Sequence, residues 1–255
     1  MSVSLPHASA VWSRNATMYA RTWMYNLLPN FFEPVFYLTA IGVGVGSYVT
    51  GMGGMSYGEF LAPGLVCVAA MNGASFETTY NVFVRMNYES TYDAMLTTPI
   101  TPDDVLAGEL SWAMTRVAIY GGAFFLVVCL FGLAPLPRAL LALPAIPLAG
   151  LLFAGLGLAF TLRVPSLDLF SFYYTLFLTP LFLFADVFFP LEERLSGAWL
   201  WLAELLPLLH PVRFARGAFS GEWSWLQLWD LAYCLGVAGL LLAWARKLLR
   251  ERLSS

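Results

Sequence analysis

Long apolar runs separated by short polar breaks fill most of this 255-residue chain. A bilayer core is about 30 Å thick, and a helix needs about 20 apolar residues to cross it. By this measure the sequence predicts an all-α membrane protein with a single transmembrane domain over residues 1–255. The six predicted spans cover residues 31–49, 60–84, 105–133, 139–162, 167–189 and 226–245.

Residues 11–28, ahead of the first predicted span, have the spacing of an amphipathic helix. Trp12 and Trp23 belong to a stripe that recurs at three- and four-residue steps, and Arg14 and Arg21 share another face. Aromatic rings at headgroup level beside basic residues are typical of a helix that lies in the membrane interface. The alternative is an ordinary leader into the first span.

The segment between spans five and six contains a further apolar run, Ala198–Leu209, which Glu204 and Pro207 interrupt. This run is too short to cross a bilayer. We therefore predict a re-entrant or interfacial helical segment that dips into the membrane surface and returns. A dip between the last two spans is typical of the outer mouth of a transporter half, and unusual for a receptor or a simple anchor.

The loop between spans two and three is polar and rich in turn-forming residues. Ser90 or Thr91 can cap a short helix that ends before Pro99. Thr101 can cap the next helix, with Pro102 at its first position. The sequence therefore predicts a short separate helix within residues 87–99.

The composition supports a membrane location and excludes one activity. Charged residues make up 11% of the chain and hydrophobic residues 59%, and the mean hydropathy is +0.70. A soluble globular domain carries about 25% charged residues. Lys247 is the only lysine, and no Gly-x-x-x-x-Gly-Lys-Ser/Thr motif surrounds it. The chain is therefore not itself a P-loop ATPase.

Metal and serine-protease chemistry find little support. Cys67, Cys129 and Cys234 lie far apart, without the spacing of a metal site. His7 and His210 are the only histidines, and no predicted span contains Gly-x-Ser-Gly. We expect no cofactor, metal or nucleic acid bound to this chain.

Basic residues divide unequally between the two sides that six spans create. One side receives Arg14, Arg21, Arg85, Arg163, Arg246, Lys247, Arg250 and Arg252, and the other receives Arg138, Arg194, Arg213 and Arg216. Cytoplasmic loops carry the excess of Lys and Arg. We therefore predict a multi-pass protein of the bacterial inner membrane with both termini in the cytoplasm.

Three carboxyl groups, those of Glu33, Glu77 and Asp186, lie within or close to predicted spans. Ionisable groups at such depth are costly and usually face a cavity or a partner. Helix-to-helix hydrogen bonds, a substrate path and a proton relay remain open as interpretations. None of the three has a basic residue inside its own predicted span, which argues against proton coupling. Glu109 and Arg116 lie two turns apart on one face, which favours a structural ion pair through neighbouring residues.

Several motifs together resemble the permease subunit of ABC-2 type exporters. Thr179-Pro180 and Phe188-Phe189-Pro190-Leu191, followed by Leu206–Pro211, resemble the carboxy-terminal signature of that family. A closer resemblance is to the nodulation protein J type. The segments that carry it are Phe60–Gly64, Ala74–Tyr80, Asp93–Leu96, Gly108–Ala113 and Phe170–Pro180.

The resemblance implies a homodimer with two copies of a cytoplasmic ABC ATPase similar to nodulation protein I, which would bind ATP and Mg²⁺. The short loop helix would then dock into the ATPase. The residues implied in this coupling are Tyr88, Glu89, Thr91, Tyr92, Asp93, Met95 and Leu96.

The resemblance also implies an amphipathic cargo, a lipo-chitooligosaccharide or a similar glycolipid, that moves outward across the inner membrane. The residues expected along the substrate path are Glu33, Tyr37, Asn72, Glu77, Phe172, Tyr173 and Asp186. Aromatic rings near the ends of the spans fit sugar and acyl chains, although an aromatic belt at the interface explains many of them equally well.

One position departs from the family pattern. Ala185-Asp186 stands where relatives often have Ser-Gly, and a carboxylate near the exit would alter the charge preference for the cargo. Three rival functions therefore stay open: a drug or antibiotic exporter, an intramembrane enzyme that modifies lipids, and a membrane scaffold.

Overall fold

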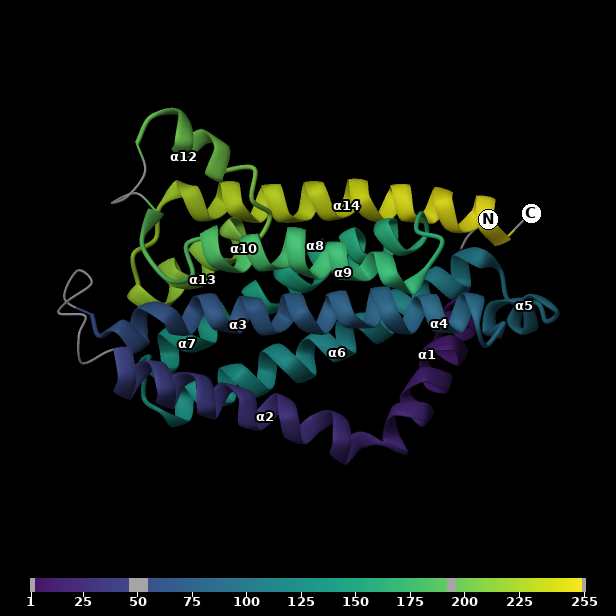
Figure 1. The fold of residues 1–255 in the computed structure, drawn as a ribbon, viewed down its shortest axis with the longest axis horizontal. Coiled ribbons are helices and arrows are strands. Elements are labelled where there is room, and N and C mark those ends of the chain that lie inside the picture. The colour runs from purple at the N-terminus through teal and green to yellow at the C-terminus, as the bar shows by residue number, and fades with distance from the viewer. Residues whose placement is uncertain (1–2, 46–54, 192–195, 254–255) are drawn as a thin grey trace.

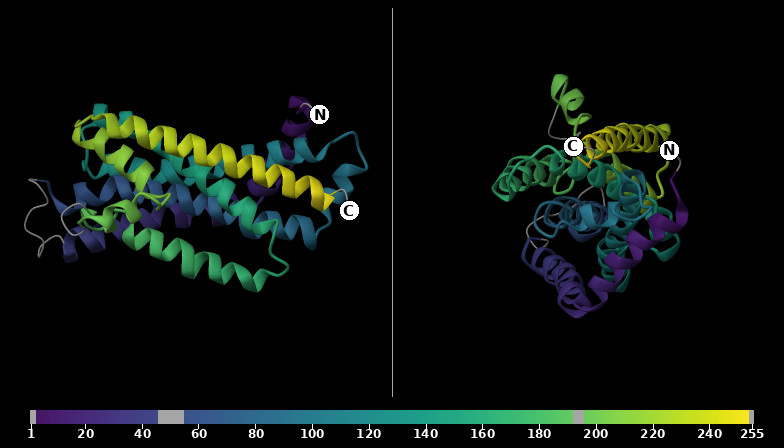
Figure 2. Two further views of the ribbon diagram at one scale, coloured as in Figure 1. Left: turned by 90° about the horizontal axis from the view of Figure 1, so that it is seen from above. Right: turned by 90° about the vertical axis from the view of Figure 1, so that its right-hand side faces the viewer.

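The computed structural model of the chain describes residues 3–45, 55–191 and 196–253, and its regular structure in these residues is helical. Most helices run along the long axis of an elongated bundle (Figures 1 and 2). Five helical segments are long and apolar enough to cross a membrane: Tyr57–Asn87, Pro102–Leu130, Leu136–Thr161, Leu167–Phe184 and Trp225–Leu253. These five correspond to predicted spans two to six.

The N-terminal region differs from the prediction of one interfacial helix over residues 11–28. Helix α1 begins earlier, at Leu5, and ends at Ala20 (Leu5–Ala20). A break at Arg21 and Thr22 follows, and α2 (Trp23–Thr39) continues into a π-helical turn, η1 (Ala40–Val45). Tertiary packing divides the stripe, because α1 packs across α6 whereas Trp23 is exposed at the start of the next helix.

Residues 31–45 of the first predicted span, 31–49, therefore lie inside a longer helical segment that starts at Trp23 and is described to Val45. Residues 46–49 lie outside the described residues. The six-span count remains a prediction.

Predicted span two is longer at both ends, whereas predicted span three starts earlier and ends at Leu130, three residues before its predicted end. The second runs through α3 (Tyr57–Phe76), the π-helical η2 (Glu77–Asn81) and α4 (Val82–Asn87). The third is α6 (Pro102–Leu130), which begins three residues before the predicted start, because Thr101 and Asp104 form a capping box and Pro102 opens the helix.

Predicted spans four to six also differ at their boundaries. The fourth is α7 (Leu136–Ala142) and α8 (Ala145–Thr161), which separate at Pro144. The fifth consists of η3 (Leu167–Leu169), α9 (Phe170–Phe172), η4 (Tyr173–Leu178) and α10 (Thr179–Phe184). It ends before residue 189, because Ala185 leaves helical geometry and Asp186 has a positive φ. The sixth, α14 (Trp225–Leu253), continues beyond residue 245 as a basic helix.

The segment between α10 and α14 contains two short helices. The predicted dip at Ala198–Leu209 is α12 (Ala198–Ala203) followed by a turn, and the longer helix is α13 (Leu209–Ser220). Helix α13 packs against α14, α7 and α3, and its apolar residues are mostly buried. The two helices differ in burial, because the apolar run is exposed along α12 whereas the more polar α13 lies inside the bundle. The dip into the membrane surface remains a prediction.

The core surrounds α3, which packs against α6, α8 and α13 and is buried on nearly every side. Small residues on α8 allow close packing with three neighbours. A Cβ atom at Gly150 would meet Val117 of α6, one at Gly155 would meet Leu241 of α14, and one at Gly157 would meet Thr78 of η2. Helices in lipid associate through such close contacts, because no hydrophobic effect drives them together.

Both chain termini lie at the same end of the bundle as α5 (Thr91–Leu96), whereas α7, α12 and α13 lie at the opposite end (Figure 1). We call these the terminal end and the distal end.

Candidate functional site

The loop predicted to carry a short helix does so at the terminal end, as α5. Ser90 stands at the N-cap position with φ 48°, in the left-handed region, and its side chain makes no capping hydrogen bond. The seven loop residues predicted to act in coupling divide by exposure: Tyr88, Glu89 and Asp93 are exposed, Met95 and Leu96 are half-buried, and Thr91 and Tyr92 are buried.

The two buried residues attach α5 to the rest of the bundle. Tyr92 is 1% exposed and packs in an apolar cluster with residues of α4, α6, α8 and α14. Arg14 of α1 donates a hydrogen bond to the Thr91 hydroxyl at 3.1 Å and contacts the Glu89 carboxylate at 3.3 Å. Contacts with α1 therefore help to hold the buried side of the loop in place, while its other side is exposed.

Beneath this loop lies a buried network of charged side chains, which we call the charge network (Glu77, Arg85, Glu109 and Arg116). Arg85 donates hydrogen bonds to Glu77 at 2.7 Å and to Glu109 at 2.6 Å. Arg116 lies 3.8 Å from Glu77. Two carboxylates are thus balanced by two guanidinium groups in a place that excludes water, as buried charges require.

The charge network shows which basic residues lie beside Glu77, for which the sequence offered no basic partner within the same predicted span. Glu77 has basic partners, Arg85 of α4 and Arg116 of α6, although neither was assigned to the Glu77 span in advance. Glu109 and Arg116 are linked through Arg85 and Glu77, as the predicted pair through neighbours requires.

Helix α1 reaches the charge network as well. Asn15 donates a hydrogen bond to Glu109 at 3.2 Å, and the Arg116 guanidinium lies 4.7 Å from the centre of the Tyr19 ring. At its start, α1 is held to α6 by the Ser4 backbone N–H, which donates to Asp104 at 2.7 Å. The α1–α6 crossing is close, since a Cβ atom at Gly108 would lie 2.5 Å from Val11.

The C-terminal part of α14 closes the same end of the molecule, and sequence reasoning missed this contact. Arg246 and Arg250 both bind the buried carboxylate of Asp103. Arg252 donates to the Leu162 carbonyl at 3.1 Å and to Asn87 at 3.0 Å. The sequence does show two arginines four residues apart beyond an apolar span, which could have indicated such a contact. Their acidic partner, however, lies more than a hundred residues away in the chain.

Three of the seven predicted path residues meet in one cavity. Glu33 and Tyr37 of α2 and Asn72 of α3 line a cavity of about 290 Å³, together with residues of α6, η4 and α10. A carboxylate, an amide and the tyrosines of the wall occur there among apolar side chains. Such a lining can hydrogen-bond hydroxyl groups while it packs against an apolar chain.

The other four predicted path residues lie elsewhere. Glu77 belongs to the charge network, and Phe172 is 56% exposed on the outside of the bundle. Tyr173 is buried, with its hydroxyl 3.2 Å from that of Ser75. Asp186 forms an ion pair with Arg216 and accepts the Leu191 N–H at 2.9 Å, so it fixes the turn at the end of α10.

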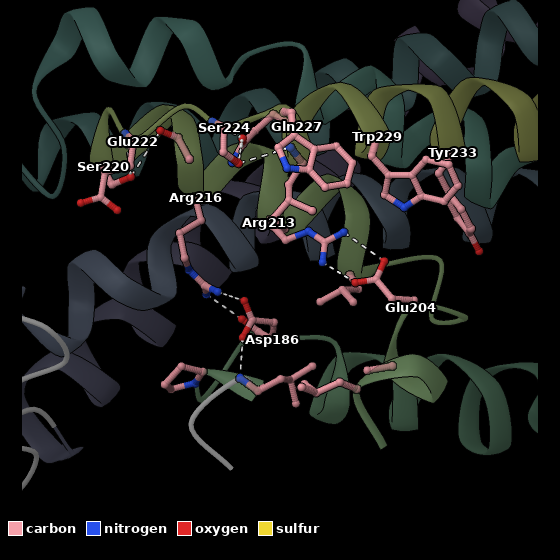
Figure 3. Close-up of a pocket in the computed structure, with 18 of the residues that line it drawn as sticks. Asp186, Glu204, Arg213, Arg216, Ser220, Glu222, Ser224, Gln227, Trp229 and Tyr233 are labelled. Atoms are coloured by element: carbon pink, nitrogen blue, oxygen red, sulfur yellow. Dashed lines mark hydrogen bonds and ion pairs between the residues drawn. The ribbon is translucent and has the colours of Figure 1, made fainter. Parts of the chain in front are cut away.

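A larger pocket of about 1350 Å³ lies at the distal end between α12, α13 and α14, and we call it the distal pocket (Figure 3). Arg213 points toward Glu204, and Arg216 points toward Asp186 (Figure 3). The Arg216 guanidinium also lies 3.9 Å from the centre of the Phe60 ring.

A second buried polar cluster joins α13 to α14 beside this pocket. His210 and Asp230 are fully buried, with His210 Nδ1 2.8 Å from the Asp230 carboxylate. Arg213 donates to Asp230 and to Glu204, so one guanidinium connects the end of α12 to both longer helices. The sequence analysis placed His210 at the outer surface and did not predict this cluster. Asp230, a carboxylate within an apolar run, was the feature of the sequence that could have indicated it.

Within the residues described, no group of three or more His, Cys, Asp or Glu side chains is arranged to hold a metal ion. The charged side chains of the charge network and of the His210–Asp230 cluster are paired with one another and connect neighbouring helices.

Comparison with known proteins extends this picture. The family model described as "ABC-2 type transporter" matches residues 7–220. Nodulation protein J of Rhizobium leguminosarum bv. viciae is 38% identical over 213 residues, which cover 84% of this chain and 82% of that protein. Nodulation protein J of Sinorhizobium fredii (strain NBRC 101917 / NGR234) is 39% identical over 82% of this chain and 79% of its own length.

A more distant relative comes from another bacterium. Inner membrane transport permease YadH of Escherichia coli (strain K12) is 24% identical over 83% of this chain and 82% of its own length. The residues that the family model matches, 7–220, include most of the N-terminal helix, the α5 loop, the charge network and α13. Together with a bundle of apolar helices, this similarity shows that the chain belongs to the ABC-2 type transporter family of membrane proteins.

Proposed function

We propose that this chain is the membrane subunit of an ATP-driven exporter that carries an amphipathic lipo-oligosaccharide or glycolipid outward across the inner membrane. The observation that carries the proposal is the similarity, over 84% of the chain, to a protein named Nodulation protein J. Two copies of the chain pair with two copies of a separate cytoplasmic ABC ATPase, which binds ATP and Mg²⁺. The absence of a P-loop from the sequence agrees with a separate ATPase.

The α5 loop is the proposed contact with the ATPase. Tyr88, Glu89 and Asp93 are exposed at the terminal end, and Thr91 and Tyr92 fix the loop to the bundle. A displacement of α5 therefore acts directly on α1 and on α4, which carries Arg85. This connection lets ATP binding and hydrolysis change the packing of the membrane helices.

The cavity lined by Glu33, Tyr37 and Asn72 is the proposed contact with the cargo inside the membrane. Its polar atoms suit sugar hydroxyls, and its aromatic and aliphatic walls suit an acyl chain. A drug or antibiotic exporter is the alternative within the same family, and the choice of cargo in the assay separates the two.

Co-purification and reconstitution test this function. The tagged chain is purified from its own host in mild detergent with the ABC ATPase that accompanies it, and the complex is reconstituted in vesicles. We expect an N-acylated chitooligosaccharide to stimulate ATP hydrolysis and to be transported. A chain that purifies without an ATPase would overturn the proposal as a whole. A complex that transports hydrophobic drugs but no acylated sugar would overturn the proposed cargo.

Asp93→Arg tests the docking surface in the same preparation. A reversed charge on exposed α5 should reduce the amount of ATPase that co-purifies, while membrane insertion is unchanged. Asp168→Arg is the matched control, because Asp168 is also an exposed carboxylate near the terminal end but lies outside α5. Equal recovery of the ATPase with both variants would show that α5 is not the docking element.

A further inference from the structure

The distal pocket has features that neither the similarity to known relatives nor the proposed transport path explains. At about 1350 Å³ it is larger than the 300–1,000 Å³ typical of sites for small molecules. It lies between α12 on one side and the start of α14 on the other, away from the cavity between α2, α3 and α10.

Exposed indole rings form the walls of this pocket. Trp201 of α12 is 79% exposed, and Trp225 and Trp229, one turn apart on α14, are 72% and 50% exposed. Trp223, before α14, completes the group and is half exposed. Interfacial tryptophans usually face lipid headgroups, but these rings come from two separate elements and line one shared hollow. Flat aromatic faces on both sides of a hollow suit flat, weakly polar rings such as pyranoses.

The polar groups of the distal pocket retain hydrogen-bonding capacity. Gln227 Oε1 accepts the backbone N–H and the hydroxyl of Ser224, whereas its amide nitrogen donates to no group among the described residues. The Glu222 carboxylate has no hydrogen-bond or ion-pair partner in the described part of the chain. The indole N–H groups of the pocket likewise donate to no described residue. Hydroxyl and acetamido groups can donate to the carboxylate and accept from the amide and indoles.

The charges of the described pocket residues disfavour an anionic ligand. Arg213 is bound by Glu204 and Asp230, and Arg216 is bound by Asp186, so neither guanidinium is free for a phosphate group. Glu222, which has no ion-pair partner among the described residues, adds a negative charge to the pocket lining. The electrostatics therefore favour an uncharged ligand over an anionic phospholipid headgroup.

We propose that the distal pocket binds the uncharged oligosaccharide head of the exported glycolipid, with Trp201, Trp225 and Trp229 as stacking surfaces and Gln227 and Glu222 as hydrogen-bonding groups. This inference rests on the proposed function and adds to it a sugar-binding site at the distal end of the molecule. Such a site holds the head of the cargo at the level where the membrane meets water, after passage through the bilayer.

Binding of a soluble sugar tests the pocket without transport. The full chain is placed in phosphatidylcholine nanodiscs, and the binding of fluorescently labelled chitotetraose, which has no acyl chain, is titrated. We expect saturable binding to the unmodified chain and at least tenfold weaker binding to Trp201→Ala and to the double variant Trp225→Ala/Trp229→Ala. These rings are exposed, so the variants are expected to fold, which thermal unfolding checks.

Two tryptophans outside the pocket serve as matched controls. Trp199 lies on α12 and is 65% exposed, and Trp244 lies on α14 and is 44% exposed, but neither lines the pocket. Trp199→Ala and Trp244→Ala should bind the sugar as the unmodified chain does. Equal losses in pocket and control variants, no sugar binding by the unmodified chain, or displacement of the sugar by phosphatidylglycerol would each overturn the proposal.

Transport by the reconstituted complex separates this inference from the proposed function. Transport of the acylated sugar without any binding of chitotetraose means that the pocket proposal alone is wrong. Binding that depends on Trp201, without transport of the acylated sugar, means that the pocket stands and the export function is wrong.

Discussion

Arg85 is the residue on which the charge network depends. Its guanidinium joins Glu77 to Glu109 across the contact between α4 and α6, in surroundings from which water is largely excluded. A buried ion pair adds little net stability when it is complete, but removal of one partner leaves an uncompensated charge. Arg85 is thus needed for the stability of the fold, independently of any role in transport.

Arg85→Met should lower the free energy of unfolding by about 3–5 kcal/mol, because two buried carboxylates lose their shared partner. Thermal or denaturant unfolding in detergent measures this loss. Arg14→Met is the matched control, since Arg14 and Glu89 are both substantially exposed and such pairs contribute about 1 kcal/mol or less.

The double variant Arg85→Met/Glu109→Gln identifies the cause. Arg85→Met leaves Glu109 without an ion-pair partner among the described residues, whereas Glu77 keeps Arg116. Removal of the Glu109 charge should therefore recover part of the lost stability. The stability losses of Arg85→Met and Glu109→Gln could instead simply add in the double variant. Such additivity would show that charge imbalance does not cause the loss of stability in Arg85→Met.

At the scale of elements, α1 connects regions that the linear sequence keeps apart. It crosses α6 at Gly108, contributes Asn15 to the charge network and holds the α5 loop through Arg14. Trp12 Nε1 also donates to the Thr115 hydroxyl at 3.0 Å. Movement of α5 and movement of α1 are therefore coupled through direct contacts.

Gly108→Ala should displace α1 from α6, because the added Cβ atom would lie 2.5 Å from Val11 and 2.8 Å from the Ala8 carbonyl oxygen. Overpacking of this kind costs about 1–3 kcal/mol, offset in part by about 1 kcal/mol from the better helix propensity of alanine. Disulfide cross-linking between Trp12→Cys and Thr115→Cys measures the displacement and should become less efficient.

Gly122→Ala is the control on the same helix, since nothing lies within 4 Å of a Cβ atom added there. It should leave cross-linking unchanged and stability equal or slightly higher. If both glycine variants cross-link as efficiently as the chain that carries only the two introduced cysteines, the α1–α6 crossing is looser than described.

The link between α12 and the bundle depends on Glu204. Hydrogen bonds from Arg213 hold the pKa of the Glu204 carboxyl below its usual value of 4.5. A carboxyl with a lowered folded-state pKa stabilises the fold above its usual pKa, and this contribution is lost as the pH falls through the lowered value. Glu204 is one-third exposed, so the contribution is below about 1 kcal/mol.

Hydrogen–deuterium exchange over α12, corrected for the intrinsic effect of pH, measures this link. Protection should stay constant from pH 8 to pH 5 and decrease only below about pH 4.5, where Glu204 begins to lose its charge. Glu204→Gln should give the low-pH level of protection already at pH 7. A decrease that is already complete above pH 5 would show that the link does not depend on the Glu204 charge.

At the scale of the whole molecule, both termini and the α5 loop lie at one end, and α12 and α13 lie at the other (Figure 1). The basic residues divide in the same way, with Arg246 and Arg250 at the terminal end and Arg213 and Arg216 at the distal end. The positive-inside rule then predicts that the terminal end faces the cytoplasm.

Reporter fusions test this orientation. A fluorescent protein fused after Ser255 should fold in the cytoplasm and fluoresce, and alkaline phosphatase inserted after Gly221 should be active in the periplasm. The distal insertion site is suitable because Gly221 follows α13 in a left-handed turn. Fluorescence at Gly221 together with phosphatase activity at the C-terminus would reverse the orientation.

The sequence by itself determined which segments are helical and apolar, because a long run of apolar residues has few alternatives once lipid replaces water. Five of the predicted spans correspond to helical segments that are long and apolar enough to cross, and the cap of α6 at Thr101 and Pro102 lies where it was predicted. Local rules also identified the loop helix between residues 87 and 99.

Only the tertiary structure decided which polar side chains meet. The sequence singled out Glu77 only by its predicted depth in the membrane. Its pairing with Arg85 and Arg116 depends on how η2, α4 and α6 pack. Glu33, Tyr37 and Asn72 come together in one cavity, whereas Tyr173 and Asp186 make structural contacts elsewhere. Depth in a bilayer is a property of one helix, which the sequence encodes locally. The pairing of buried charges and the lining of a cavity are properties of several helices, so they follow only from the packed arrangement.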